Sequence, residues 1–213
     1  MSCLLLVGGG GHCLTVIDSL PIGRYEKVGI VDTPDLVGQT LNGVEVVGCD
    51  EDIESLRTKY NEAFISLGSI GNWQKREEIA IKLKQLEYVV DTIIHSKAYV
   101  NMKSKLACGV LVGAGSFVNA CADIGEMSIL NTGSIIEHHC IIESYVHIAP
   151  GTVLCGNVRI GKGTHIGAGS VIREGVSVGQ NVLIGIGSVV TKNIPDNVVA
   201  YGNPCEIRKE AVL

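Results

Sequence analysis

The stretch VRIGKGTHIGAGSVI, residues 158–172, carries an isoleucine at every sixth position. Followed in both directions, the same six-residue step meets Leu, Ile or Val at seventeen consecutive positions from Ile94 to Val190. Four residues after each of them stands Ala, Ser, Thr, Val or Cys, until Ile194 ends the run. A six-residue period fits no α-helix, and it predicts a parallel β-helix built of hexapeptide repeats.

In such a solenoid each hexad forms one short strand and one turn, and three hexads complete a triangular coil of about 18 residues. The aliphatic residue and the small residue two positions before it point inward, and the residue between them points outward. Residues 94–195 therefore predict between five and six coils, which would make a prism roughly 27 Å long at about 4.8 Å per coil.

Outward positions 18 residues apart form one column on each face of this prism. One column is apolar throughout, a second is mostly polar, and a third contains two histidines. They comprise, in that order, Phe117, Ile135, Val153, Val171 and Val189; Lys105, Asp123, Ile141, Arg159 and Ser177; and Leu111, Ile129, His147, His165 and Leu183. An apolar stripe outside a closed core predicts a subunit interface, and a triangular prism favours a closed threefold ring, so we expect a homotrimer. The two histidines are expected on adjacent coils, about 5 Å apart.

The first 93 residues have a different pattern, in which short apolar runs alternate with helical segments. Strands are expected at CLLLV (3–7), KVGIVD (27–32), VEVVG (44–48), AFISLG (63–68) and YVVDTII (88–94), and helices at 13–20, 50–60 and 72–86. The charges of the last helix are expected to form its solvated face. This alternation predicts a Rossmann-like α/β domain with a parallel sheet over residues 1–93, followed by the β-helix over 94–195 and a tail over 196–213.

The composition restricts the class of protein. Hydrophobic residues make up 46% and charged residues 18%, as in a folded globular chain. The net charge of -5 argues against nucleic-acid partners, and no apolar run approaches the ~18 residues that membrane insertion needs. The first ten residues, MSCLLLVGGG, have no basic segment of the kind that begins a signal peptide. The eight cysteines contain no C-x-x-C pair, which favours reduced thiols and a cytoplasmic location.

Three motifs resemble one family, the bacterial sugar O- and N-acyltransferases with hexapeptide repeats. They are GGGGH at 8–12, NTGSIIEHHC at 131–140 with His147 nine residues past His138, and YGNPCEIRK at 201–209. The family includes sialic acid O-acetyltransferases and nucleotide-linked amino-sugar N-acetyltransferases. The resemblance implies a left-handed β-helix, acetyl-CoA as co-substrate, and the amine of a nucleotide-linked amino-sugar as acceptor.

The same resemblance assigns roles to residues of the β-helix. His138 is the implied general base, which would take a proton from the acceptor as it attacks the thioester. The residue after the base is usually a carboxylate that raises its basicity, and here it is His139. Either Glu137 or another group substitutes for that carboxylate, or the base is less activated. Acetyl-CoA contacts are implied for His147, Ala168 and Ile186.

The α/β domain is the acceptor side in this resemblance. The implied contacts to the nucleotide-sugar are Gly10, Gly11, His12, Asp32, Thr33 and Gly68. General physics is consistent with this assignment, because a Gly-rich turn that opens a helix presents free N–H groups to phosphate. An acidic residue about 20 positions further on can bind a ribose hydroxyl.

Two other functional classes fit the pattern. The first is an O-acetyltransferase that acts on a sialic acid or another sugar hydroxyl. The second is a metal-dependent or non-catalytic β-helix protein, with zinc held by His138, His139, His147 or His165. No carboxylate or thiolate completes an evident ligand set, so no metal is expected. We expect His95 and His165 to be structural.

Overall fold

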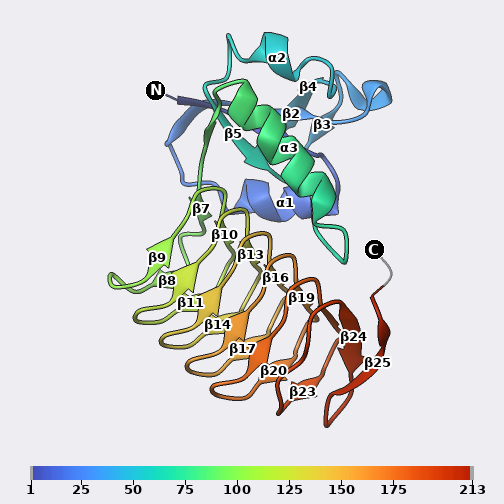
Figure 1. Ribbon diagram of the computed structural model, residues 1–213. Coiled ribbons are helices and arrows are strands. Elements are labelled where there is room, and N and C mark those ends of the chain that lie inside the picture. The colour runs from blue at the N-terminus through green and yellow to red at the C-terminus, as the bar shows by residue number, and fades with distance from the viewer. Residues whose placement is uncertain (1, 212–213) are drawn as a thin grey trace.

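The computed structural model describes residues 2–211 and consists of an α/β domain seated on one face of a stack of parallel coils (Figure 1). The α/β domain has a six-stranded sheet in the order β3-β4-β2-β1-β5-β6, parallel except for the pair β3 and β4. The strands are β1 (Ser2–Val7), β2 (Tyr25–Val31), β3 (Thr40–Leu41), β4 (Val44–Gly48), β5 (Glu62–Ile65) and β6 (Val89–Val90). The parallel α/β arrangement predicted for this half is confirmed.

Three helices cover the two faces of this sheet. They are α1 (Gly11–Asp18), α2 (Ile53–Leu56) and α3 (Gln74–Gln85), with a short 3-10 helix at Pro34–Leu36. On one face α2 and α3 enclose a core with Leu5, Val7 and Tyr60. On the other face α1 lies between the sheet and the coils (Figure 1), with Leu4 and Phe64 in its core. The sheet is therefore buried on both sides, as a parallel sheet requires.

Three parallel sheets form the walls of the β-helix. We call them the domain face (β7, β10, β13, β16, β19, β22), the stripe face (β8, β11, β14, β17, β20, β23) and the polar face (β9, β12, β15, β18, β21). The strands in chain order are β7 (Ile93–Ile94), β8 (Tyr99–Val100), β9 (Lys105–Leu106), β10 (Leu111–Val112), β11 (Phe117–Val118), β12 (Asp123–Ile124), β13 (Ile129–Leu130), β14 (Ile135–Ile136), β15 (Ile141–Ile142), β16 (His147–Ile148), β17 (Val153–Leu154), β18 (Arg159–Ile160), β19 (His165–Ile166), β20 (Val171–Ile172), β21 (Ser177–Val178), β22 (Leu183–Ile184) and β23 (Val189–Val190). Two further strands, β24 (Val198–Tyr201) and β25 (Glu206–Glu210), extend the domain face.

The register between coils is 18 residues throughout, as the hexad pattern predicts. Phe117 pairs with Ile135, for example, and His147 pairs with His165. The inward aliphatic residues form one continuous core along the prism. Buried hydroxyls in this core donate to carbonyls of the next turn, as Thr164 Oγ1 does to the Gly179 carbonyl at 2.7 Å. Ser and Thr are therefore tolerated at inward positions because their polar atoms are satisfied.

Two local expectations are wrong, and one strand was not foreseen. Ile94 is in register with the inward Val112, as expected, and it is 37% exposed in the first coil, whereas its outward neighbour Ile93 is buried beneath the α/β domain. The expected strand 88–94 is two strands, β6 and β7, because the chain leaves one sheet and enters another at Asp91 and Thr92. The helix expected at 50–60 has only the four residues of α2, and β3 was not foreseen.

The α/β domain packs on the outward residues of the domain face. Leu111 and Ile129 lie outside the closed core of the β-helix, yet they are fully buried against α1 residues Cys13 and Val16. Two of the three outward columns begin with apolar residues. The α/β domain covers the apolar residues of one of these columns. The stripe face carries the other, and its Phe117 is exposed in the chain.

Arg76 of α3 connects the two halves and corrects another expectation. Its guanidinium was expected on the solvated face of the helix, but the residue is only 1% exposed. It donates to the backbone carbonyls of Ile65 at 3.0 Å, Leu67 at 2.5 Å and Met127 at 3.0 Å. These carbonyls belong to the end of β5, the loop after it and a coil turn, so one cation satisfies acceptors from both halves. Burial lowers the pKa of Arg76 to about 10, which leaves it charged at neutral pH.

In the described range 2–211, no helix has the length and apolar character to cross a membrane.

A matched pair of substitutions tests the inward and outward assignments. Ile142 is 2% exposed in the core of the β-helix, and its neighbour Ile141 faces outward on the polar face. Ile142→Ala should lower the free energy of unfolding by about 2–5 kcal/mol because it leaves a cavity. Ile141→Ala should cost less than about 1 kcal/mol, measured by urea unfolding at one protein concentration. Equal costs at the two positions would contradict the assignment.

Candidate active site

His138 stands in the turn that follows β14 on the stripe face, and its side chain is exposed. Its imidazole lies across Gly156, the equivalent turn residue of the next coil. A Cβ at position 156 would lie 2.4 Å from Cε1 and 2.6 Å from Nε2 of this ring. The glycine therefore leaves the space in which the imidazole lies.

His139 follows directly, also exposed, and its ring is the polar neighbour of His138. The two Nδ1 atoms are 3.2 Å apart and the rings meet edge to face, with an interplanar angle of 81°. Glu137, the other group that could support the base, forms no hydrogen bond to either ring within residues 2–211. The structure thus brings together the two histidines that were predicted to be catalytic.

A second cluster lies where the α/β domain meets the domain face. His147 and His165 stack on adjacent coils with ring centroids 4.8 Å apart, which confirms their predicted proximity. The ring of His12, from the start of α1, is 6.3 Å from that of His147. Gly68 lies against His12, since a Cβ at this glycine would be 3.6 Å from the histidine Cβ. Residues predicted for the acceptor and for acetyl-CoA therefore meet in this cluster.

A chain of hydrogen bonds holds His147 in one tautomer. Its Nδ1 is 2.6 Å from the Ser69 carbonyl, so this nitrogen carries the proton and donates it. His165 Nδ1 shares the same carbonyl at 3.2 Å. The other nitrogen of His147, Nε2, lies 3.3 Å from Asn131 Nδ2 and accepts from it. The Asn131 amide is oriented in turn by the Thr132 N–H, which donates to its Oδ1 at 2.8 Å.

Burial keeps the imidazoles of this cluster neutral. The pKa of His147 is lowered to about 3, mainly by burial and further by the neighbouring His165. The pKa of His12 is lowered to about 4, by burial first and then by the positive charge of Arg76. Burial also lowers the pKa of His165. These rings can accept or donate hydrogen bonds near pH 7, but they do not carry charge there.

Asp32 directly follows β2 and organises the Gly-rich turn. Its carboxylate accepts from the Gly9 N–H and, at 2.7 Å, from the Thr33 N–H. A Cβ at Gly9 would lie 2.5 Å from Asp32 Oδ2, so this close approach requires the glycine. Gly10 and Gly11, which follow, are exposed at the start of α1, and nothing lies within 4 Å of a Cβ built on them.

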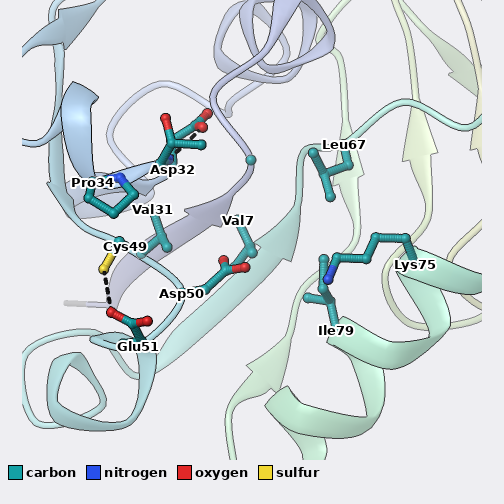
Figure 2. Close-up of a pocket in the computed structure, with 12 residues that line it drawn as sticks. Val7, Val31, Asp32, Pro34, Cys49, Asp50, Glu51, Leu67, Lys75 and Ile79 are labelled. Atoms are coloured by element: carbon teal, nitrogen blue, oxygen red, sulfur yellow. Dashed lines mark hydrogen bonds between the residues drawn. The ribbon is translucent and has the colours of Figure 1, made fainter.

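A pocket of about 370 Å³ opens beside Asp32 and Thr33 at the carboxyl ends of β1, β2, β4 and β5. This edge is where open parallel sheets bind ligands. Val7 and Val31 line its floor, and Figure 2 shows Lys75 of α3 on the opposite side of the pocket from Asp32. Asp50 also lines the pocket.

Ala168 and Ile186 lie away from His138 in a single chain. They stack on each other in turns that follow β19 and β22 on the domain face, whereas His138 follows a strand of the stripe face. Ile186 is 81% exposed, an unusual state for an isoleucine. The predicted base and these predicted coenzyme contacts therefore lie on two different edges of the prism.

Several residues of these sites were not predicted. Asn131 belongs to the quoted motif NTGSIIEHHC, so its place in the sequence was a usable signal. Ser69 acts through its backbone carbonyl, which no sequence pattern reveals. Lys75 lines the pocket because of where α3 packs, and Arg76 is buried for the same reason.

No group of three or more His, Cys, Asp or Glu side chains that could hold a metal ion occurs between residues 2 and 211. The absence of a metal stays a prediction.

Comparisons with known proteins agree with this architecture. Residues 3–83 match the family model described as the PglD N-terminal domain, and residues 157–192 match the bacterial transferase hexapeptide repeats. The chain is also similar to perosamine N-acetyltransferase from Caulobacter crescentus. A histidine-to-asparagine variant of that enzyme, solved with CoA and GDP-perosamine, has 31% identity over 99% of this chain and 98% of its own, with a TM-score of 0.92.

The chain belongs to the hexapeptide-repeat sugar acyltransferases.

Other members of the family have the same two-part architecture. The acetyltransferase domain of PglB from Neisseria gonorrhoeae is 29% identical over 98% of this chain and all of its own, with a TM-score of 0.91. WeeI from Acinetobacter baumannii is 25% identical over the same shares, with a TM-score of 0.86. The family resemblance read from the sequence motifs is thus confirmed.

The neutral histidines of the buried cluster predict a pH dependence of stability. In the unfolded chain His147 binds a proton near pH 6.5, but in the folded protein only near pH 3. The unfolded state therefore holds more protons below pH 6.5, and the free energy of unfolding falls as the pH is lowered, by about 1.4 kcal/mol per pH unit for this group. His147→Asn keeps an N–H near the Ser69 carbonyl without this proton uptake.

We expect His147→Asn to show a shallower loss of stability between pH 6.5 and 5 than the unchanged protein, by about the same 1.4 kcal/mol per pH unit. Urea unfolding at matched protein concentration measures the difference. Parallel pH dependences of the two proteins would contradict the neutral, buried state of this imidazole.

Proposed function

We propose that this protein transfers the acetyl group of acetyl-CoA to the amine of a nucleotide-linked amino-sugar. The observation that carries the proposal is its likeness, at 31% identity over nearly the whole chain, to perosamine N-acetyltransferase with CoA and GDP-perosamine bound. A PglB acetyltransferase domain in complex with acetyl coenzyme A is 29% identical over 97% of this chain and supports the same co-substrate. The product class is an N-acetylated sugar nucleotide.

His138 is the general base of the proposed reaction. The amine nitrogen attacks the thioester carbonyl, and Nε2 of His138 removes a proton from that nitrogen as the N–C bond forms. The C–S bond then breaks, and the proton passes from the imidazolium to the departing CoA sulfur. Atoms and charge balance without an acyl-enzyme, so no cysteine is needed. Backbone N–H groups at the coil turns supply donors for the oxyanion.

The α/β domain holds the acceptor in this proposal. Exposed N–H groups of Gly10 and Gly11 at the start of α1 suit a phosphate, because a helix N-terminus favours anions. The pocket beside Asp32 and Thr33 has about 370 Å³ for the nucleoside. His12 and Gly68 lie between this pocket and the β-helix, where the sugar would pass toward the base. His147 would meet the acetyl-CoA side as a neutral hydrogen-bonding group.

The working enzyme is a homotrimer in this proposal. The stripe face exposes an apolar column, with Phe117 and Val171 among its exposed residues. His138 lies in the turn after β14 of this face, whereas Ala168 and Ile186 lie on another edge of the prism. A closed ring of three prisms places the edge of one chain beside the edge of the next, which would complete the acetyl-CoA groove. All eight cysteines are free thiols, which fits a reaction in the cytoplasm.

Replacement of the base tests the chemistry. His138→Asn should lower kcat by roughly 10²–10⁴-fold, since proton transfer would be lost, whereas acetyl-CoA binding should be unchanged. Release of the free CoA thiol with a panel of nucleotide-linked amino-sugars measures turnover, and calorimetric titration measures binding. Near-normal turnover by the variant would refute the assignment of His138.

A charge on the stripe face tests the assembly. Val171→Asp should convert the trimer to monomers at micromolar concentration, because an unpaired carboxylate would be buried at the interface. Ser177→Asp, on the polar face of the same coil, serves as the matched control and should leave the mass unchanged. Light scattering after gel filtration gives the masses, and an unchanged protein that runs as a monomer would contradict the proposal.

A further inference from the structure

The contact between His138 and His139 has a feature that the proposed reaction does not use. Their Nδ1 atoms lie 3.2 Å apart, a hydrogen-bond distance, and the rings are nearly perpendicular. Two neutral imidazoles can form such a bond only if one Nδ1 carries a proton and the other presents its lone pair. The arrangement therefore couples the tautomer of the base to its neighbour.

His139 adopts the left-handed backbone conformation that several coil turns share. Its φ is 59°, in the left-handed region, and it lies three residues after the inward Ile136. The equivalent turn residues one and two coils further on are Asn157 and Gly175, types that tolerate this conformation well. Cys121, the equivalent residue one coil earlier, has the same conformation, with a φ of 61°. The turn itself therefore sets this conformation, and a glycine fits the position at least as well as a histidine.

Within residues 2–211, no carboxylate forms a hydrogen bond with either ring of the pair. The turns stacked directly before and after contribute Ala120, Cys121, Gly156 and Asn157, none of which is an acid. Glu174 lies two coils further along the same edge, about 10 Å away at the coil spacing. Glu137 lies on the same hexad, and it affects the buried thiol of Cys140, whose pKa is raised to about 11 by burial first and also by this carboxylate.

We propose that His139 is the positioning residue of the base, and that it accepts the Nδ1–H of His138 through its own Nδ1. This proposal rests on the proposed role of His138. In this pair His138 is held as the Nδ1–H tautomer, and its Nε2 lone pair is free for the acceptor amine. When Nε2 takes the proton, His139 shares the positive charge through the same hydrogen bond.

This imidazole pair behaves differently from a histidine with a carboxylate partner. A carboxylate stays negative at neutral pH and raises the pKa of the neighbouring histidine strongly. A neutral imidazole stabilises the imidazolium less, and a second proton on the pair is opposed by like charge. A carboxylate in place of His139 should therefore move the acidic limb of the pH–activity profile to higher pH.

Substitutions of His139 separate this role from a structural one. Glycine removes the side chain and relieves the positive φ, so His139→Gly should fold at least as well as the unchanged protein. Cys121→Gly, at the equivalent turn position one coil earlier with φ 61°, is the matched control. His139→Glu supplies a permanent acceptor. The readouts are kcat, both KM values and the pH profile of kcat/KM from CoA release.

We expect His139→Gly to lower kcat by about 10- to 100-fold with both KM values unchanged, the range for loss of an imidazole-orienting partner. Its acidic limb should move to lower pH. His139→Glu should recover turnover above neutral pH and move the acidic limb up by about one pH unit. Cys121→Gly should behave as the unchanged enzyme. Unchanged kcat and pH profile in His139→Gly would overturn the proposal.

An observation that needs no turnover keeps the two proposals separable. Imidazole ¹⁵N shifts of the full-length protein report which nitrogen of His138 is protonated. The Nδ1–H form should dominate in the unchanged protein and be lost in His139→Gly. If the shifts behave so while no amino-sugar nucleotide is acetylated, the histidine pair stands and the proposed function fails. If His138→Asn loses turnover but the ¹⁵N shifts of His138 are the same in His139→Gly as in the unchanged protein, the proposed role of His139 fails and the proposed function stands.

Discussion

Regular stacking of coils at an 18-residue step is the constraint on which the rest of this structure depends. Each outward side chain lies beside its equivalent in the next coil, because parallel strands pair in one fixed register. That register places His147 on His165 and His138 on Gly156. A slip of one residue would turn every outward side chain into the core. The packing of the aliphatic core therefore fixes where the histidine side chains of the β-helix lie.

The junction between the two halves is held by hydrogen bonds to backbone carbonyls as well as by apolar contact. Arg76 satisfies three carbonyls, and the Ser69 carbonyl receives two imidazole N–H groups. Each donor is buried, and a buried donor without an acceptor would cost free energy. The junction is consequently specific in geometry, and it holds the Gly-rich turn of the α/β domain in a fixed place relative to the coils. In the proposed reaction, that place decides where the sugar enters.

Two groups of histidines in this chain lie in different environments and have different properties. Those at the domain junction are kept neutral by burial, so they suit recognition by hydrogen bonds. Those in the turn after β14 are exposed and contact each other through ring nitrogens, so they suit proton transfer. Both groups come from a sequence with six histidines in all. The environment, and not the residue type, separates recognition from catalysis here.

The hexad period was sufficient to predict the β-helix, its three faces and the proximity of the paired histidines, because these properties repeat locally. The motifs around His12 and His138 likewise identified the family. The sequence pattern did not reveal that the α/β domain covers the histidine face, nor that Arg76 is buried. Those facts depend on packing between residues far apart in the chain, such as Trp73 and Asn181, which are 108 positions apart and hydrogen-bonded at 3.3 Å. Periodicity reflects contacts between neighbouring coils, whereas the face that the α/β domain covers depends on contacts between the surfaces of both halves.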